Sequence, residues 1–211
     1  MSYRIFFLTA MILALANPVR AGEGDAAAGK RKAAPCLECH NAGDAIKYPS
    51  IPILAGQSRA YLAHQMYAFR RSGQGRGVSP TKEFRHHAIM DQLVIALTDR
   101  EIADFATFFA AQACRDSRAN MPARVPLIVN RCAACHNHEG RGNYSRAPKL
   151  AGQNRLYLLN QLQAFFRSAG GVIDWTLEID RHHRIMTRQM GMVSERDMGD
   201  IAAYYAALPC Q

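Results

Sequence analysis

This 211-residue sequence lacks long apolar runs, and it also lacks long stretches in which apolar and polar residues alternate. Beyond its first residues, no segment has the roughly 20 consecutive apolar residues that a membrane span requires, so we expect a soluble mature chain. No segment alternates between apolar and polar residues over a long stretch, which argues against an extended β-sheet and favours an all-α fold. Tryptophan occurs once and cysteine six times. Four of the cysteines form two Cys-x-x-Cys pairs.

The first residues have the features of a secretory signal peptide. Arg4 supplies the positive charge, residues 5–16 form an apolar run, and Val19 and Ala21 stand at the two positions that a signal peptidase reads. The alternative, a membrane anchor, needs a longer apolar run. We therefore expect cleavage after Ala21, so that residues 1–21 are a signal peptide and the mature protein is exported to the periplasm.

Acidic residues are fewer than basic ones, with 17 Asp and Glu against 26 Lys and Arg, which gives a formal charge of +9. Removal of Arg4 and Arg20 with the signal peptide leaves +7. A basic surface often indicates nucleic acid binding, but export argues against that partner. The charge favours docking to an acidic patch on a partner protein, or peripheral association with anionic lipid headgroups. A solvated basic surface without a dedicated partner is the alternative.

An internal repeat with a constant offset of 96 residues divides the chain. The offset carries Cys36-x-x-Cys39-His40 onto Cys132-x-x-Cys135-His136 without a gap. Other matched segments follow the same offset: Leu54-Ala-Gly-Gln57 with Leu150-Ala-Gly-Gln153, Tyr61-Leu62 with Tyr157-Leu158, and His86-His87 with His182-His183. We predict two homologous domains, residues 22–116 and 117–211, joined by a proline-containing linker at 120–126.

The residue after each cysteine pair is a histidine, and Cys-x-x-Cys-His is the attachment signature for c-type haem. The two thiols bond to the porphyrin, and the histidine is the proximal ligand of the iron. A redox dithiol or half of a zinc site is the alternative for one isolated copy. Two copies at equivalent positions behind a signal peptide favour two covalently bound haem c groups. The predicted haem residues are Cys36, Cys39, His40, Cys132, Cys135 and His136.

Both halves are predicted to contain the same series of helices. Ser58 is a typical N-cap, and Thr98 with Glu101 is typical of a capping box. The predicted helices cover residues 25–34, 58–71 and a segment from 98 in the first half, and 125–134, 154–167 and a segment from 194 in the second. Domains this small have little core for their surface, so a buried haem would supply apolar bulk.

The sixth ligand of each iron is predicted to be a methionine. Met90 and Met186 are equivalent in the repeat and lie just before the third predicted helix, where a loop can fold over the haem. His/Met ligation raises the reduction potential. The rival ligands are the repeated histidines, which we interpret instead as exposed pairs near the haem edge: His86, His87, His182 and His183.

Other repeated residues are candidates for secondary haem contacts. Pro52 and Pro148 each follow the haem histidine by twelve residues, and a carbonyl of such a loop can accept the histidine Nδ1 hydrogen bond. Polar residues of the second predicted helix are candidates for contacts with the haem propionates, with ordinary helix packing as the alternative. They are Tyr61, Gln65 and Arg71, with their equivalents Tyr157, Gln161 and Arg167.

Together these residues resemble the dihaem cytochrome c4 family, whose domains have the class I cytochrome c fold. Besides the attachment motifs, the matching segments of the first half are Pro52-x-Leu54-Ala-Gly-Gln57, Tyr61-Leu-x-x-Gln65, Phe69-Arg70 and Met90, and most recur in the second. The resemblance covers essentially the whole mature chain. It implies tandem class I domains, two haems that meet near the domain interface, and periplasmic electron transfer to a terminal oxidase. The His-His pairs depart from the family pattern.

Three functions compete. The favoured one is an electron carrier, not an enzyme, that passes single electrons from a respiratory donor such as a quinol-oxidising complex to an acceptor such as a terminal oxidase. The second is the haem subunit of a flavoprotein dehydrogenase that oxidises sulfide or another small reductant. The third, a dihaem peroxidase, needs a sixth site that opens beside an acid or base, which Met90 and Met186 oppose.

Cys114 and Cys210 stand outside the haem motifs but are equivalent in the repeat. If the halves are related by a pseudo-two-fold axis, equivalent residues can meet near it, so these cysteines are a candidate disulfide. Such a bridge would close a long loop and add roughly 4 kcal/mol in the chain-entropy model. Free thiols or an intermolecular bridge are the alternatives.

Overall fold

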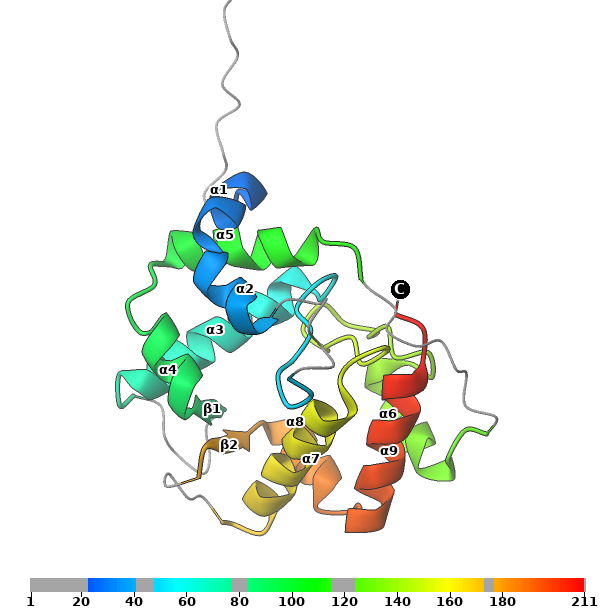
Figure 1. Cartoon of the computed structure of the whole chain (residues 1–211). Coiled ribbons are helices and arrows are strands. Elements are labelled where there is room, and N and C mark those ends of the chain that lie inside the picture. The colour runs from blue at the N-terminus through cyan, green and yellow to red at the C-terminus, as the bar shows by residue number, and fades with distance from the viewer. Residues whose placement is uncertain (1–22, 41–47, 77–82, 115–123, 173–176, 211) are drawn as a thin grey trace, which may run out of the picture.

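The computed structural model describes residues 23–40, 48–76, 83–114, 124–172 and 177–210. The predicted signal peptide and the predicted boundary near residue 117 lie outside these residues. The described part is mostly helical, with one short pair of strands (Figure 1). Within it, no helix combines the length and the apolar character that crossing a membrane requires.

The two halves repeat nearly the same order of elements. The first contains α1 (Ala26–Lys32), α2 (Ala34–His40), α3 (Arg59–Gly73), β1 (Phe84–His87), α4 (Ala88–Val94) and α5 (Asp99–Ala110). The second contains the 3-10 turn η2 (Leu127–Val129), α6 (Asn130–His136), α7 (Arg155–Ala169), β2 (Ile179–His182), α8 (Arg184–Met190) and α9 (Glu195–Ala207). Figure 1 shows α1 to α5 gathered in one half and α6 to α9 in the other, with β1 beside β2 between them.

The predicted start signals of the long helices are in place. The Ser58 side chain accepts a hydrogen bond from the Tyr61 N–H at the start of α3, and Ser194 caps α9 in the same way. Thr98 and Glu101 form the capping box of α5. Each of these bonds satisfies an N–H that has no partner inside its helix. The helices predicted at these positions are confirmed, with ends shifted by a residue or two.

The helices around the first cysteines differ from the prediction. The sequence pattern predicts one helix over residues 25–34, whereas α1 ends at Lys32 and α2 begins at Ala34. Pro35 explains the break, because a proline ring clashes with the preceding turn of a continuous helix but is tolerated in the first turn of a new one. In the second half, Pro126 precedes η2, and α6 follows it directly. The Cys-x-x-Cys-His residues therefore lie within α2 and α6.

Four short elements were not predicted: β1, β2, α4 and α8. Each strand has only four residues, and its partner lies in the other half of the chain, so neither shows a local alternating pattern. The two helices begin directly after the strands, where His87 and His183 act as N-caps. Histidine is a less usual cap than Ser, Thr, Asp or Asn, which is why these starts escape sequence reasoning.

Each half has its own apolar core. In the first half the buried cluster consists of Ala33, Leu62, Phe105, Ala106 and Phe109. In the second it consists of Val129, Leu158, Leu162, Phe165, Met190, Val193, Met198, Ile201, Ala202, Tyr204, Tyr205 and Leu208. The clusters do not share a residue, so the halves meet through the polar contacts described below rather than through one continuous core.

A pseudo-two-fold axis relates the halves. β1 and β2 pair in antiparallel fashion with Arg85 facing Arg181, and these arginines are equivalent in the repeat. When equivalent residues face each other across such a pair, the axis passes between them. A disulfide joins a second equivalent pair, Cys114 and Cys210, whose Cα atoms are 5.9 Å apart. Contacts near the axis therefore occur in reciprocal pairs.

Candidate haem sites

The cysteines of the two attachment motifs carry free thiols. Cys36 and Cys132 are half-buried, each against the apolar cluster of its own half. Burial raises the pKa of Cys36 and raises that of Cys132 to about 11. The buried position of one thiol in each pair places it against the apolar core, where a bulky apolar group can pack beside it. Among the described residues, no three His, Cys, Asp or Glu side chains gather into a metal-binding group.

The two motif histidines are held in one tautomer by proline carbonyls. His40 Nδ1 lies 3.0 Å from the Pro52 carbonyl oxygen, and His136 Nδ1 lies 3.1 Å from that of Pro148. A carbonyl can only accept, so Nδ1 carries the proton and Nε2 keeps the lone pair that binds a metal. Burial lowers the pKa of both rings, which keeps them neutral. Each ring is thus prepared as an iron ligand.

The structure corrects the surroundings predicted for the candidate sixth ligands. Met90 and Met186 are half-buried within α4 and α8, not in loops. His87 Nδ1 accepts from the Met90 N–H at 3.4 Å, and His183 Nδ1 accepts from the Met186 N–H at 3.4 Å. These two histidines therefore position the helix that presents the methionine.

His86 and His182, which precede these capping histidines, are also hydrogen-bonded and half-buried. His86 Nδ1 lies 2.6 Å from the Asp91 carboxylate, and His182 Nδ1 lies 2.8 Å from the Ser168 hydroxyl. The interpretation of the His-His pairs as exposed residues is wrong. His86 Nδ1 also lies 3.4 Å from the Ser72 hydroxyl of α3, as His182 lies against Ser168 of α7, so each ring is held against the long helix of its own half.

Two buried arginines at the interface were missed by the sequence reasoning. Arg85 and Arg181 are only 7% and 8% exposed. Each stacks on an aromatic ring of its own half, with the guanidinium carbon 4.4 Å from the Phe69 centroid and 4.6 Å from that of Phe165. The signal was available, because both arginines directly precede the repeated histidines.

Most candidates for propionate contacts gather around these arginines. Arg85 donates to the Gln65 side-chain oxygen at 2.7 Å and, across the interface, to the Tyr157 hydroxyl at 2.8 Å. Arg181 makes the reciprocal bonds, to Gln161 at 2.8 Å and to Tyr61 at 3.2 Å. Four of the six predicted residues, Tyr61, Gln65, Tyr157 and Gln161, are thus brought together. The other two candidates, Arg71 and Arg167, do not join this group of bonds.

The charges in this group act on the phenols. Burial raises the pKa of Tyr61, but the positive charges of Arg181 and Arg85 outweigh burial and bring the pKa down to about 8. Burial keeps the pKa of Tyr157 above its ordinary value, with a further increase from the negative charge of a Tyr61 phenolate. The buried arginines thus place positive charge at the interface, and this charge lowers the pKa of Tyr61 and would suit an anionic ligand.

Comparison with known proteins identifies the family. The family model described as cytochrome c matches residues 126–208. The cytochrome c4 of Azotobacter vinelandii is 30% identical over 202 residues, which cover 88% of this chain and 90% of that protein. This chain belongs to the cytochrome c4 family.

Solved structures agree with this assignment. The reduced recombinant cytochrome c4 from Pseudomonas stutzeri matches with a TM-score of 0.66 and 27% identity, over 88% of this chain and 99% of that chain. The thiosulfate dehydrogenase from Marichromatium purpuratum matches with a TM-score of 0.60 and 28% identity, over 82% of this chain and 36% of that one. The predicted fold is confirmed. As a cytochrome c4 family member, the chain is a cytochrome c electron carrier rather than an enzyme.

The described residues of this chain fit the covalent haem c that the family implies. Two thiols outside any disulfide and a histidine whose Nε2 can bind a metal stand together in each motif. Arg167 donates from Nη2 to the Ile179 carbonyl at 2.8 Å, but its Nε is buried without a hydrogen-bond partner among the described residues. An orphaned buried N–H is costly, and a propionate carboxylate is a suitable acceptor. When bound, haem c supplies a one-electron Fe(III)/Fe(II) couple.

Proposed function

We propose that this protein is an exported cytochrome c4 that carries two haem c groups and transfers single electrons in the periplasm. The observation that carries the proposal is the doubled motif in which each histidine donates Nδ1–H to a proline carbonyl. The thiols of Cys36 and Cys39 attach one haem, and those of Cys132 and Cys135 attach the other. His40 and His136 are the proximal ligands.

A methionine of each half would be the second protein ligand of its haem iron. Met90 and Met186 are equivalent residues on helices whose starts are fixed by His87 and His183. The capping bonds use Nδ1 of these histidines, which supports a structural role for them. A haem iron held by one histidine and one methionine would have no position left for a substrate and would supply only a one-electron couple, as an electron carrier requires.

The arginines of the interface provide the countercharge for the haem propionates in this proposal. The Arg85 charge contributes, after burial, to the lowered pKa of His40, and the Arg181 charge contributes in the same way at His136, so each arginine lies near one proximal ligand. The two guanidiniums face each other on the pseudo-two-fold axis. They would hold the propionate edges of both haems against the interface, the shortest route for an electron between the halves.

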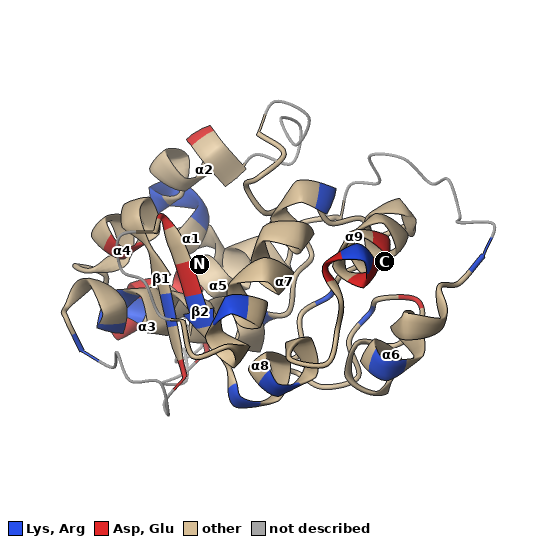
Figure 2. Cartoon of the chain, turned by 90° about the horizontal axis from the view of Figure 1, so that it is seen from below, with Lys and Arg blue, Asp and Glu red and all other residues tan. Residues whose placement is uncertain are grey.

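Several partners are compatible with this carrier. We favour a quinol-oxidising complex as donor and a terminal oxidase as acceptor. Figure 2 shows Lys and Arg spread over both halves, including α1, α3, α6 and α8, so either half offers positive charge to an acidic partner or to anionic headgroups. Such charge mainly speeds the encounter of the partners.

A second candidate is a haem subunit of a dehydrogenase complex. The match to a thiosulfate dehydrogenase over 36% of that chain supports it, because a unit of this fold there forms part of a larger oxidoreductase. Purification from the native periplasm distinguishes the two. A free carrier elutes at the size of one chain, whereas a subunit elutes with a second protein that has thiosulfate- or sulfide-oxidising activity.

Intact mass measurement under denaturing conditions, followed by a spectroscopic redox titration, tests the main proposal. We expect the mass of residues 22–211 plus two haems, and two one-electron transitions with methionine–iron charge-transfer absorption in the oxidised state. The double variant Cys36→Ser/Cys39→Ser is expected to retain one haem, as is Cys132→Ser/Cys135→Ser. A wild-type protein with one haem or none would overturn the proposal.

A further inference from the structure

Two buried glutamines cross the interface and bind the backbone of the opposite half. The Gln57 side chain accepts from the Lys149 N–H at 2.9 Å and donates to the Lys149 carbonyl at 2.9 Å. The Gln153 side chain accepts from the Ile53 N–H at 2.8 Å and donates to the Ile53 carbonyl at 2.9 Å. The glutamines are equivalent in the repeat, as are the residues they bind. Each amide thus acts as a two-point clamp.

Each clamp holds the residue directly after the proline whose carbonyl accepts the hydrogen bond from the motif histidine. Ile53 comes directly after Pro52, whose carbonyl accepts from His40, and Lys149 comes directly after Pro148, whose carbonyl accepts from His136. One peptide bond therefore connects the proline carbonyl to the N–H that the glutamine binds. Gln153 consequently fixes the acceptor of the first haem's histidine, and Gln57 fixes that of the second.

The clamps are rigid. Gln57 and Gln153 are 6% and 8% exposed, and the amide oxygen of each also accepts from the N–H of the next residue, Ser58 or Asn154, at 2.9 Å. Both amide groups are thereby held in one orientation, since only the oxygen accepts and only the NH₂ donates.

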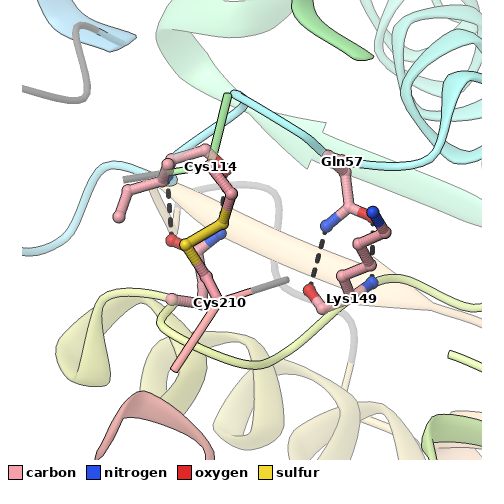
Figure 3. The surroundings of a disulfide bond; sticks show 6 residues. Gln57, Cys114, Lys149 and Cys210 are labelled. Atoms are coloured by element: carbon pink, nitrogen blue, oxygen red, sulfur yellow. Dashed lines mark hydrogen bonds between the residues drawn. A yellow bond between two sulfur atoms is a disulfide. The ribbon is translucent and has the colours of Figure 1, made fainter. Parts of the chain in front are cut away.

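The disulfide reinforces this position. Gly56 and Gly152, the residues before the glutamines, lie so close to Cys114 and Cys210 that an added Cβ would come within 3.0 Å and 2.7 Å of the cysteine Cβ atoms. Figure 3 shows the disulfide beside the bonds between Gln57 and Lys149. The loop that carries each glutamine is therefore packed against the covalent link between the halves.

We propose that Gln57 and Gln153 are positioning residues that set the reduction potential of the haem in the opposite half, by holding the carbonyl that accepts the proximal histidine N–H. This inference rests on the proposed dihaem function. A histidine that donates a firm Nδ1–H hydrogen bond is a more basic ligand and stabilises Fe(III) relative to Fe(II). Loosening the clamp weakens that bond, so the reduction potential of the opposite haem rises.

The test uses the holoprotein variants Gln57→Met and Gln153→Met, which nearly preserve side-chain volume but remove both amide bonds. The potential of each haem is measured separately, from the NMR signals of its own methyl groups in partly oxidised samples. We expect Gln57→Met to raise the reduction equilibrium constant of the second haem three- to tenfold, or about 30–60 mV, with the first haem unchanged. Gln153→Met is expected to raise the reduction equilibrium constant of the first haem by the same factor and to leave the second haem unchanged.

Ser58→Ala is the matched control. The Ser58 hydroxyl also donates across the interface, to the Ser145 carbonyl, and it caps α3, but it does not touch Lys149 or Ile53. The substitution removes the cap but keeps the Ser58 N–H from which the Gln57 amide oxygen accepts a hydrogen bond. Loss of the hydroxyl should leave both potentials unchanged. If the Met variants do not fold, Gln57→Asn and Gln153→Asn, which are too short to reach the opposite backbone, should give the same crossed pattern.

Three outcomes overturn the inference: a shift confined to the haem of the mutated half, an equal shift of both haems, or no shift. Each requires that the unaltered protein shows two haems with His/Met ligation. If the unaltered protein lacks them, the proposed function itself fails, so the two failures are distinguishable.

Discussion

At the scale of single residues, the guanidiniums of Arg85 and Arg181 are buried, and they donate to amide and phenol side chains: Gln65, Gln161, Tyr61 and Tyr157. Taking a cation out of water is expensive unless a counter-charge compensates. The phenol and amide dipoles and the rings of Phe69 and Phe165, on which the guanidiniums stack, offset part of this cost. A haem propionate beside them would complete the compensation.

Replacing one of these charges should change a potential. We expect Arg85→Met to lower the potential of the first haem, because a nearby positive charge opposes formation of Fe(III). The Coulomb energy at an effective dielectric constant near 20 is about 1–2 kcal/mol over distances of roughly 10 Å, or some 40–90 mV for one electron. A redox titration measures the shift. Arg124→Met removes an exposed charge and should leave the potential nearly unchanged, whereas equal shifts in both variants would exclude a local effect.

At the scale of elements, the short helices α4 and α8 show how a methionine is presented. Neither helix is long enough to be stable in isolation, since helices under about 12 residues are marginal in water. Each depends on the histidine cap at its start and on packing against α3 or α7. The histidine cap therefore helps to fix the position of the methionine.

Substitution of His87 distinguishes its role as the N-cap of α4 from a role as an iron ligand. His87→Asn keeps a capping side chain, whereas His87→Ala removes it at a cost of about 1 kcal/mol to α4. We expect both oxidised variants to show the methionine–iron charge-transfer band at low temperature. On heating, His87→Ala should lose this band at a lower temperature than His87→Asn. Immediate loss of native ligation in both variants would instead identify His87 as the ligand.

The start of α5 is stabilised by a charged cap. The Glu101 carboxylate accepts from Lys32 Nζ at 2.7 Å and from the Thr98 N–H at 3.0 Å, and these bonds, that from Lys32 first, bring its pKa down to about 2. A pKa below the ordinary value of 4.5 means that the carboxylate stabilises the fold fully above pH 4.5, and that this contribution is lost as the pH falls toward 2.

Thermal unfolding at a series of pH values tests this assignment. The Tm of Glu101→Gln should lie below that of the unaltered protein at pH 6, and the difference should shrink as the pH falls from 4.5 toward 2. Glu195→Gln, which changes an exposed carboxylate at the start of α9, is the control. A Tm difference that stays constant down to pH 2 would contradict the lowered pKa of Glu101.

At the scale of the whole molecule, the halves are held by reciprocal contacts around one axis. The arginine bonds and the glutamine clamps each occur in two reciprocal copies. The Arg85–Arg181 pair of β1 and β2 and the Cys114–Cys210 disulfide join equivalent residues. Such polar contacts are geometrically specific, and the disulfide limits the separation of the halves when the other contacts open. The two haem sites are thus held in a fixed relation.

Thiol counting on the denatured, unreduced holoprotein checks the covalent link. We expect no titratable thiol, because four cysteines are in haem thioethers and two are in the disulfide. The variant Cys114→Ser/Cys210→Ser should lose about 4 kcal/mol of stability toward denaturant, since its unfolded chain is no longer closed into a loop. Two free thiols, or a disulfide-linked dimer, would contradict the bond seen here.

The sequence by itself determined what depends on local patterns. The Cys-x-x-Cys-His motifs, the offset of 96 residues and the caps Ser58 and Thr98 predicted the haem attachment, the duplication and the long helices. The motifs and caps lie within a few residues of the features they specify, and the duplication is seen by comparing the sequence with itself. The constant spacing from His40 and His136 singled out the proline carbonyls as well.

Tertiary structure alone decided the contacts between the halves. Arg85 faces Arg181, and Gln57 reaches Lys149, only because the pseudo-two-fold axis brings together residues about 90 or more positions apart. The strands exist because they pair with each other, and α4 and α8 begin where those strands end. A repeat states that equivalent residues are alike, but it does not state where the symmetry axis lies. The packing of the halves fixes that axis, and with it the surroundings of both haem sites.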